Sequence, residues 1–290
     1  MFKNKPKCLK SGIVFLSNIA FFPQDCRLIS FNSRVLKDFL GFIRLNVCLF
    51  VTGIGVSGYL LFNPIDIRLL WVALSCFFVG AAGYSFNMRT DKEEDLINRK
   101  KINPFAMSNT GAILVICFII LGAFFSRFLS TLSIIFYWIM VVLDIVYSYF
   151  RMKKIFPFKN LFTGFGLTQV FFIGAANAPI TIETITYYFV ISLFIFITSL
   201  VSDLRDYDGD KAIDIRTIPV VLGYNNGKNF AYLMLILSSV AIFSLNLRGL
   251  YTLLLFVLPI VFYLHRDEPK AAHHYLLTSF TFLPLGILLI

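Results

Sequence analysis

Residues 69–95 read LLWVALSCFFVGAAGYSFNMRTDKEED, a long apolar run followed at once by a cluster of acids. A helix needs about 20 mostly apolar residues to cross the hydrocarbon core of a membrane. The run is therefore long enough to span a bilayer, and the acids mark the end at which it leaves. Charged groups beside a low-dielectric interior are costly, so a run of acids at this point calls for a functional reason.

The rest of the chain is equally apolar. Of its 290 residues, 58% are hydrophobic and only 14% are charged, which excludes an ordinary soluble globular protein. Alternating strand patterns are absent and the apolar runs are too long for barrel strands, so the sequence predicts an all-α polytopic membrane protein. The nine predicted spans are 40–62, 68–87, 110–126, 131–150, 161–179, 185–202, 229–247, 249–264 and 271–290.

The basic residues give the predicted orientation. They gather in the N-terminal segment and in the connections that follow spans 2, 4, 6 and 8, whereas the opposite side offers only Arg68, Arg127 and Arg248. By the positive-inside rule the basic side faces the cytoplasm of a protein of the cell membrane. This distribution also argues against nucleic acid as a partner, despite the net charge of +10. Residues 1–38 are interpreted as an interfacial N-terminal extension and residues 39–290 as one domain.

A second acidic cluster follows span 6, where residues 202–216 read SDLRDYDGDKAIDIR. Both clusters follow even-numbered spans, so they are predicted to lie on the same, cytoplasmic side of the membrane. Their positions suggest two similarly oriented halves, a weak internal repeat. A single acidic pair at a helix end would be interpreted as solvated loop charge, but two clusters at equivalent positions favour a binding site.

The spacing within each cluster places the acids on one helical stripe. Asn87, Asp91 and Asp95 lie four residues apart, and Asp206 and Asp210 repeat that step. Asp203 lies one turn before Asp206. Carboxylates so close together need a positive partner, and hard oxygen ligands suit Mg²⁺ bound together with a phosphorylated substrate.

These motifs resemble those of the UbiA-type intramembrane prenyltransferase superfamily, and the resemblance covers roughly residues 38–290. Members carry NxxxDxxxD after the second helix, DxxDxxGD after the sixth and YxxxK after the fourth. The matching positions are Asn87, Asp91 and Asp95, then Asp203, Asp206, Gly209 and Asp210, and finally Tyr149 and Lys153.

The resemblance implies nine helices around a central cavity, with cytoplasmic loops covering it. It also implies two Mg²⁺ ions that bridge the aspartates to a prenyl diphosphate, whose prenyl group passes to an acceptor with release of pyrophosphate. Asn87, Asp91, Asp95, Asp203, Asp206 and Asp210 are the expected metal ligands.

Basic residues near the motifs are expected to bind the diphosphate. Arg151 and Lys153 would add positive charge after span 4, and Arg99 and Lys101 would cover the diphosphate after span 2. Arg44 lies where many members have Arg-Pro-x-Asn, although here the run is IRLNV, and the usual Arg-Pro-rich stretch after the first motif is INRKKINPFAMSN. Both departures leave the acceptor open.

Asp144 is a separate clue because it lies inside span 4, where an unpaired carboxylate is costly. Asp144, Tyr147 and Arg151 share one helical face. We expect this stripe to line the cavity, with Asp144 orienting Tyr147, a basic residue or the acceptor. The alternative interpretation is a buried structural pair. His265, His273 and His274 have no acidic or cysteine partner at ligand spacing and are interpreted as interfacial.

Three functions fit this pattern to different degrees. The first is a prenyltransferase whose acceptor is either an aromatic quinone precursor or a prenylglycerol phosphate. The second is a cation-coupled transporter that uses the same carboxylates, but transport sites usually lie near the bilayer midplane rather than at helix ends. The third is a non-catalytic scaffold, which would be expected to have lost metal-binding aspartates. The sequence favours the first and leaves prenyl length and oligomeric state open.

Overall fold

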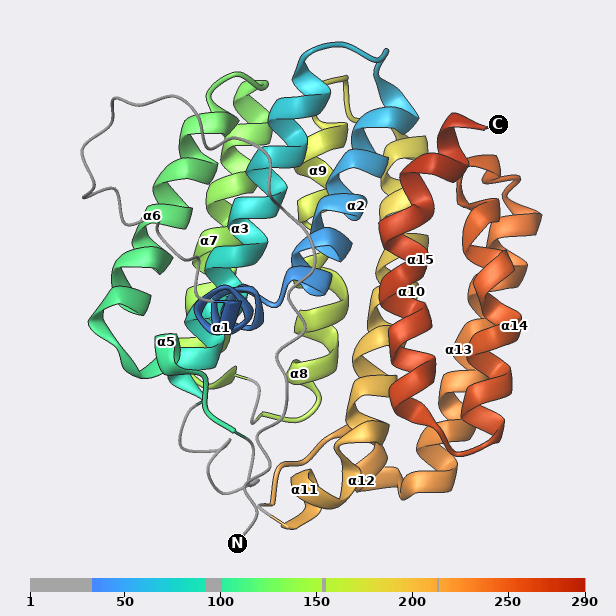
Figure 1. Ribbon diagram of the computed structural model, residues 1–290. Helices are drawn as coiled ribbons and strands as arrows, with labels where there is room; N and C mark the ends of the chain where they lie inside the picture. The colour runs from blue at the N-terminus through green and yellow to red at the C-terminus, as the bar shows by residue number, and fades with distance from the viewer. Residues whose placement is uncertain (1–32, 92–100, 153–154, 213, 290) are drawn as a thin grey trace, which may run out of the picture.

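The computed structural model describes residues 33–91, 101–152, 155–212 and 214–289, and within these ranges the secondary structure is helical (Figure 1). The long helices are α2 (Leu45–Phe62), α3 (Arg68–Thr90), α6 (Asn109–Ser126), α7 (Thr131–Tyr149), α10 (Ile182–Arg205), α13 (Tyr224–Ser244), α14 (Tyr251–His265) and α15 (Pro269–Leu288). The shorter ones are α1 (Ser33–Ile43), α5 (Pro104–Met107), α8 (Phe158–Leu161), η2 (Phe162–Gly166), α9 (Val170–Ala175), α11 (Tyr207–Ala212), α12 (Ile218–Leu222) and η3 (Arg248–Leu250). The prediction of an all-α polytopic fold is confirmed.

Seven helical segments in the described ranges are long and apolar enough to cross a membrane. They are α2, α3, α6, α7, α10, α13 and the continuous η3–α14 segment. The predicted span 161–179 is instead divided among α8, the π-helical turn η2 and α9. The predicted span 271–290 corresponds to α15, whose first turns carry Lys270, His273 and His274. The count of nine spans stays a prediction.

The predicted first span is interrupted at Arg44, which takes a left-handed conformation with φ of 50°. The interruption separates α1 from α2, and Figure 1 shows α1 nearly end-on while the long helices run up the page. Helix α1 exposes Arg34 and Lys37 and buries Phe42 and Ile43, the pattern of a helix that lies along an interface. The predicted extension therefore ends inside a helix, and its residues 1–32 lie outside the described ranges.

Polar side chains set the starts of three of the long helices. Ser108, Ser130 and Thr181 each accept a hydrogen bond from a backbone N–H in the first turn of α6, α7 and α10, respectively. The first-turn N–H groups of a helix lack partners within the helix, so such caps stabilise its start by about 1 kcal/mol. Ser108 and Ser130 thus set the starts of α6 and α7, which fall within one residue of the predicted spans 110–126 and 131–150.

Small residues allow the central helices to touch. A Cβ atom on Gly58 of α2 would overlap the carbonyl of Phe171, and one on Gly174 of α9 would overlap the carbonyl of Gly55. Close backbone approach of this kind is how membrane helices associate without a hydrophobic driving force between them. The result is a tightly packed centre in which α10 contributes the most buried residues.

The outer helices present apolar side chains outward. On α6 the exposed residues Ile113, Ile116, Ile120 and Phe124 recur every three or four positions, which places them on one face. A lipid-facing stripe of this kind is what a helix at the perimeter of a membrane bundle requires.

Candidate functional site

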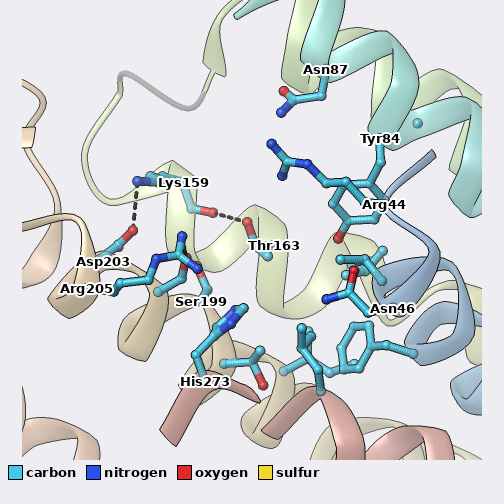
Figure 2. Close-up of a pocket in the computed structure, with 18 of the residues that line it drawn as sticks. Arg44, Asn46, Tyr84, Asn87, Lys159, Thr163, Ser199, Asp203, Arg205 and His273 are labelled. Carbon is cyan, nitrogen blue, oxygen red and sulfur yellow. Dashed lines mark hydrogen bonds and ion pairs between the residues drawn. The ribbon is translucent and has the colours of Figure 1, made fainter. Parts of the chain in front are cut away.

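A cavity of about 1120 Å³ lies within the bundle. The ends of α2, α3, α7, α10 and α15 and the broken segment α8–η2 surround it (Figures 1 and 2). Polar and charged groups line its mouth, whereas residues further into the spans are apolar, including Phe50, Met140, Leu167 and Ile195. A pocket with a charged mouth and an apolar interior suits a ligand that has a charged head and a greasy tail.

The first acidic cluster lies at the end of α3. Asn87 lines the cavity, and its amide Nδ2 donates to Asp91 Oδ2 over 2.9 Å. Asp91 ends the helix and also accepts a 3.3 Å hydrogen bond from Thr90 Oγ1. The predicted four-residue step from Asn87 to Asp91 is therefore present as a direct contact. Asp95 and Arg99, the next predicted members, lie outside the described residues.

Two successive contacts join this end of α3 to α7. Ser148 Oγ donates to Asn87 Oδ1 over 3.2 Å. One turn deeper, the carboxyl group of Asp144 packs so closely on Gly83 that a Cβ atom there would overlap it. Asp144 also lines the cavity. Gly83 therefore leaves the room that the Asp144 carboxyl group occupies one turn below Asn87.

The second acidic cluster is neutralised by basic side chains of the described residues. Lys159 Nζ of α8 lies 2.7 Å from Asp203 Oδ1 and 3.3 Å from Asp210 Oδ2. Arg205 makes two contacts with Asp206, of 3.0 Å from Nε and 2.7 Å from Nη2. Asp206 ends α10, and the chain turns there so that Asp210 in α11 returns toward Asp203.

Burial and ion pairing act in opposite directions on these groups. Burial raises the pKa of Asp210, and the charge of Lys159 partly offsets that rise. Burial also disfavours the charged ammonium of Lys159, but the nearby carboxylates of Asp203 and Asp210 outweigh it and raise the pKa of Lys159. The charged state of Lys159 is thus favoured by the carboxylates of Asp203 and Asp210, and the charged state of Asp210 is favoured by Lys159.

Asn160, next to Lys159, ties the cluster to α10. Its Nδ2 donates to Asp203 Oδ2 over 2.7 Å and to Ser199 Oγ over 3.1 Å. Its Oδ1 is buried and accepts no hydrogen bond from the described residues. Buried oxygens normally have a partner. The Asn160 Oδ1 atom could therefore coordinate a bound metal ion or accept a hydrogen bond from the water of that ion.

The oxygen-bearing side chains around the cavity fit the ligand preference of Mg²⁺. Across the described residues, no group of three or more His, Cys, Asp or Glu side chains lies close enough to hold a metal ion as it stands. The carboxylate and amide oxygens of Asn87, Asp91, Asp203 and Asn160 are nevertheless hard ligands, and Mg²⁺ usually keeps several waters and takes the rest of its ligands from a substrate phosphate. The side chains therefore fit an ion shared with a phosphorylated ligand better than a closed protein cage.

The other predicted substrate-binding residues divide into two groups. Arg44 and Tyr147 line the cavity, and the ring of Tyr147 stacks on Phe162 with centroids 5.3 Å apart. Tyr149 and Lys101 do not line it, and the Tyr149 side chain is 67% exposed. Lys153 lies outside the described residues.

The predicted stripe of Asp144, Tyr147 and Arg151 is wrong at its last member. Helix α7 ends at Tyr149, and Arg151 takes a left-handed conformation with φ of 54°. Helical spacing therefore no longer applies at Arg151, which does not line the cavity. Only Asp144 and Tyr147 share the cavity face.

Four cavity or cluster residues were not identified as site residues from the sequence: Lys159, Asn160, Arg205 and His273. In the sequence, Lys159 and Arg205 are two of the basic residues in the connections that follow spans 4 and 6. His273 and His274, which are interpreted as interfacial, both line the cavity from α15. Figure 2 shows the guanidinium groups of Arg44 and Arg205 reaching toward one space, with Asn87 and Asp203 on different walls. The side chain of Lys159 is directed at Asp203 (Figure 2). The one available signal was the Lys-Asn pair just before the glycine-rich break of span 5.

Residues 47–280 match the sequence profile described as the UbiA prenyltransferase family.

Two curated relatives carry the name digeranylgeranylglyceryl phosphate synthase. The one from Haloquadratum walsbyi is 29% identical over 192 residues, covering 62% of this chain and 65% of that protein. The one from Methanocaldococcus jannaschii is 25% identical over 232 residues, covering 76% of this chain and 80% of that protein. The chain thus spans just under two thirds of the length of the first relative and most of the second.

Solved structures share the fold. A UbiA homolog from Aeropyrum pernix K1 superposes with a TM-score of 0.70 at 16% identity, covering 85% of this chain and 98% of that one. A UbiA homolog from Archaeoglobus fulgidus, solved bound to DMAPP and Mg²⁺, gives a TM-score of 0.60 at 15% identity, covering 84% and 86%. At these identities the likeness shows a common fold.

Proposed function

Because this chain belongs to the UbiA prenyltransferase family, we propose that it transfers a prenyl group from a prenyl diphosphate to a prenylglycerol phosphate, with release of pyrophosphate. The chain is an integral membrane protein by its apolar helices and its family. The choice of acceptor is supported by the names of the relatives.

One observation carries the proposal most directly: Asn87 of the first cluster and Asp203 of the second line the same cavity from different helices. They stand at its polar mouth, above an apolar interior. This arrangement suits a prenyl diphosphate, whose charged head would stay at the mouth and whose tail would lie among apolar side chains.

The residues that would hold Mg²⁺ are Asn87, Asp91, Asp95, Asp203, Asp206 and Asp210, and we propose two ions, one at each cluster. Bound there, Mg²⁺ would offset the charge that develops on the leaving pyrophosphate. The Archaeoglobus homolog solved with DMAPP and Mg²⁺ supports this choice of ion. Asn160 Oδ1 is a further oxygen that an ion or its water could contact.

The chain's own side chains complete the proposed site. Arg44 and Lys159 line the cavity, and their positive charges would attract the diphosphate. Tyr84, Tyr147 and Phe162 line the same cavity, and aromatic faces stabilise a nearby cation such as an allylic carbocation. Asp144, one turn below Asn87, is placed to orient the acceptor or Tyr147.

The polar end of the cavity is proposed to face the cytoplasm of the cell membrane, with the N-terminus on that side. The support is the excess of basic residues at this end of the bundle, which the positive-inside rule assigns to the cytoplasm. Residues 1–38 are proposed to lie at the same interface as an extension of one intramembrane domain, because the part of them that is described begins the amphipathic helix α1.

The test uses the full chain in nanodiscs and measures pyrophosphate release from prenyl diphosphates of increasing length. Each is supplied with a prenylglycerol phosphate, with an aromatic acid such as 4-hydroxybenzoate, or with no acceptor. We expect release only with the prenylglycerol phosphate and only with Mg²⁺, and EDTA should abolish it. Release only with the aromatic acid would show that the acceptor is an aromatic compound and not a prenylglycerol phosphate. No release from a folded protein that binds no diphosphate would contradict the transferase and favour the cation transporter.

A further inference from the structure

Lys159 lies between two carboxylates that belong to another part of the chain. It comes from the short helix α8, whereas Asp203 and Asp210 come from α10 and α11. The side chains of Asp203 and Asp210 are only 2% and 9% exposed, and that of Lys159 is 20% exposed and lines the cavity. One ammonium thus neutralises two nearly buried acids, and it belongs to a lysine that lines the cavity.

Two buried carboxylates that close together cannot both remain charged without a positive neighbour, because each is deprived of solvent. A divalent cation is one such neighbour, and Lys159 is another. The two cannot occupy the same place: an ion that binds both Asp203 and Asp210 from between them meets the ammonium already there.

A second observation shows that one buried oxygen at this place lacks a partner within the described residues. Asn160 holds Asp203 Oδ2 through its Nδ2, yet its own Oδ1 is buried and accepts no hydrogen bond within the described part of the chain. The Lys159 ammonium contacts the carboxylates of Asp203 and Asp210. It leaves Asn160 Oδ1 without a hydrogen bond from any described residue. A hydrated divalent cation, with more ligand positions than an ammonium has protons, can serve all three groups.

We propose that Lys159 is an exchangeable counter-ion of the second acidic cluster. It neutralises Asp203 and Asp210 while no metal is bound, and a divalent cation must displace it to bind there. The displaced ammonium, already on the cavity wall, then turns toward the diphosphate. This inference rests on the proposed function, since it assumes that the cluster binds a divalent cation.

A purely structural ion pair makes a different prediction. If Lys159 only fastens α8 to α10, its removal weakens the fold and the metal site together. If Lys159 competes with the metal, its removal weakens the metal-free protein but strengthens metal binding, because nothing has to be displaced. The signs of the two metal effects are opposite, so the two roles can be separated.

The experiment measures Mn²⁺ binding by electron paramagnetic resonance and thermal unfolding, both on the full chain in nanodiscs after treatment with a chelator. The variants are Lys159→Met, which keeps the length of the stem, and Lys159→Arg, which keeps the charge. The control is Lys211→Met, because Lys211 lies in the same loop region but over the ring of Tyr207 at 5.8 Å. Asp206→Asn reports on loss of a proposed ligand.

We expect Lys159→Met to lower the unfolding temperature of the metal-free protein by about 5 °C or more. It should also tighten Mn²⁺ binding at least about tenfold, and saturating Mn²⁺ should restore most of the lost stability. Lys159→Arg and Lys211→Met should bind Mn²⁺ as the wild type does. Equal or weaker Mn²⁺ binding by Lys159→Met would overturn the exchange. Absence of Mn²⁺ binding in the wild type and in Lys159→Met alike would instead contradict the proposed function on which the inference rests.

Discussion

The two acidic clusters stand on the same cavity but are stabilised differently. In the first, Asp91 accepts hydrogen bonds from the Asn87 amide and the Thr90 hydroxyl. In the second, Asp203 and Asp210 share the ammonium of Lys159, and Asp206 is held by Arg205. The contacts described at the first cluster come from neutral groups, and those described at the second come from cations.

The difference shows that an acidic motif does not by itself specify how its charge is balanced. Hydrogen bonds from neutral groups leave the negative charge of a carboxylate in place, whereas an ion pair cancels it. A metal ion that binds between Asp203 and Asp210 would therefore replace a cation that is already there. Substitutions in the two clusters should have different effects on stability, and the following tests begin with the largest.

The largest stability difference is expected between Asp203→Ala and Asn87→Ala. Asp203→Ala leaves Lys159 with half of its compensation in a nearly buried place, and breaking such a pair costs about 3–5 kcal/mol. Asn87→Ala removes two hydrogen bonds, each worth about 1 kcal/mol net. Both are measured by thermal or denaturant unfolding in detergent without metal. Equal losses would show that the two clusters are balanced in the same way.

The next effect concerns Asp144, one turn below the first cluster. Asp144→Asn keeps the shape that packs on Gly83 but removes the carboxyl group from the cavity. We expect the turnover number to fall by about tenfold, equivalent to roughly 1.4 kcal/mol, with little change in unfolding temperature. Steady-state kinetics with both substrates tests this. Unchanged turnover and unchanged KM values would assign Asp144 to a structural pair.

A smaller effect is expected from Ser148→Ala. The Ser148 hydroxyl group donates to Asn87 Oδ1, so its loss frees the Asn87 amide to turn away from Asp91. Removing one neutral hydrogen bond costs about 1 kcal/mol, which predicts an increase of a few-fold in the Mg²⁺ concentration required for half-maximal activity. The control is Ser239→Ala, because the Ser239 hydroxyl group bonds only to its own helix, away from the cavity. An equal shift in both variants would contradict this role.

The smallest effect on activity is expected at the other end of α3, where Asp66 precedes the helix. Hydrogen bonds, first from Arg68 and then from Tyr59, hold the pKa of Asp66 at about 2, below its ordinary value. The stabilising contribution of a carboxyl group with a lowered pKa is present above about pH 4 and is lost as the pH falls toward 2. Asp66→Asn should therefore reduce the acid dependence of the unfolding temperature between pH 5 and pH 2 and leave turnover unchanged. A loss of turnover would place Asp66 within the reach of the site.

The fold and the family were predictable because both depend on patterns local in sequence. Apolar runs and caps such as Ser130 define the helices, and the i, i+4 spacing from Asn87 to Asp91 survives as a direct contact. The break at Arg44 was not predictable, since the apolar pattern continues across it and only packing decides the left-handed conformation.

The ion pairs of the site were not predictable for a related reason. Lys159 and Asp203 are 44 positions apart, and only the break of span 5 into α8 and η2 brings the lysine to α10. The prediction for Arg151 was wrong for the opposite reason. It assumed helical spacing beyond Tyr149, where α7 ends. Local periodicity thus predicts which residues share a helix face, but not which faces meet.

Pyrophosphate release tests most directly whether the two acidic clusters act on one diphosphate. It is measured as a function of Mg²⁺ concentration in the wild type, Asp91→Asn and Asp206→Asn, each in nanodiscs with a prenylglycerol phosphate. If both clusters act on one diphosphate, each substitution alone reduces release by at least about 100-fold at saturating Mg²⁺, since each removes stabilisation of the same leaving group. Wild-type release by either folded variant would contradict a site shared by the two clusters.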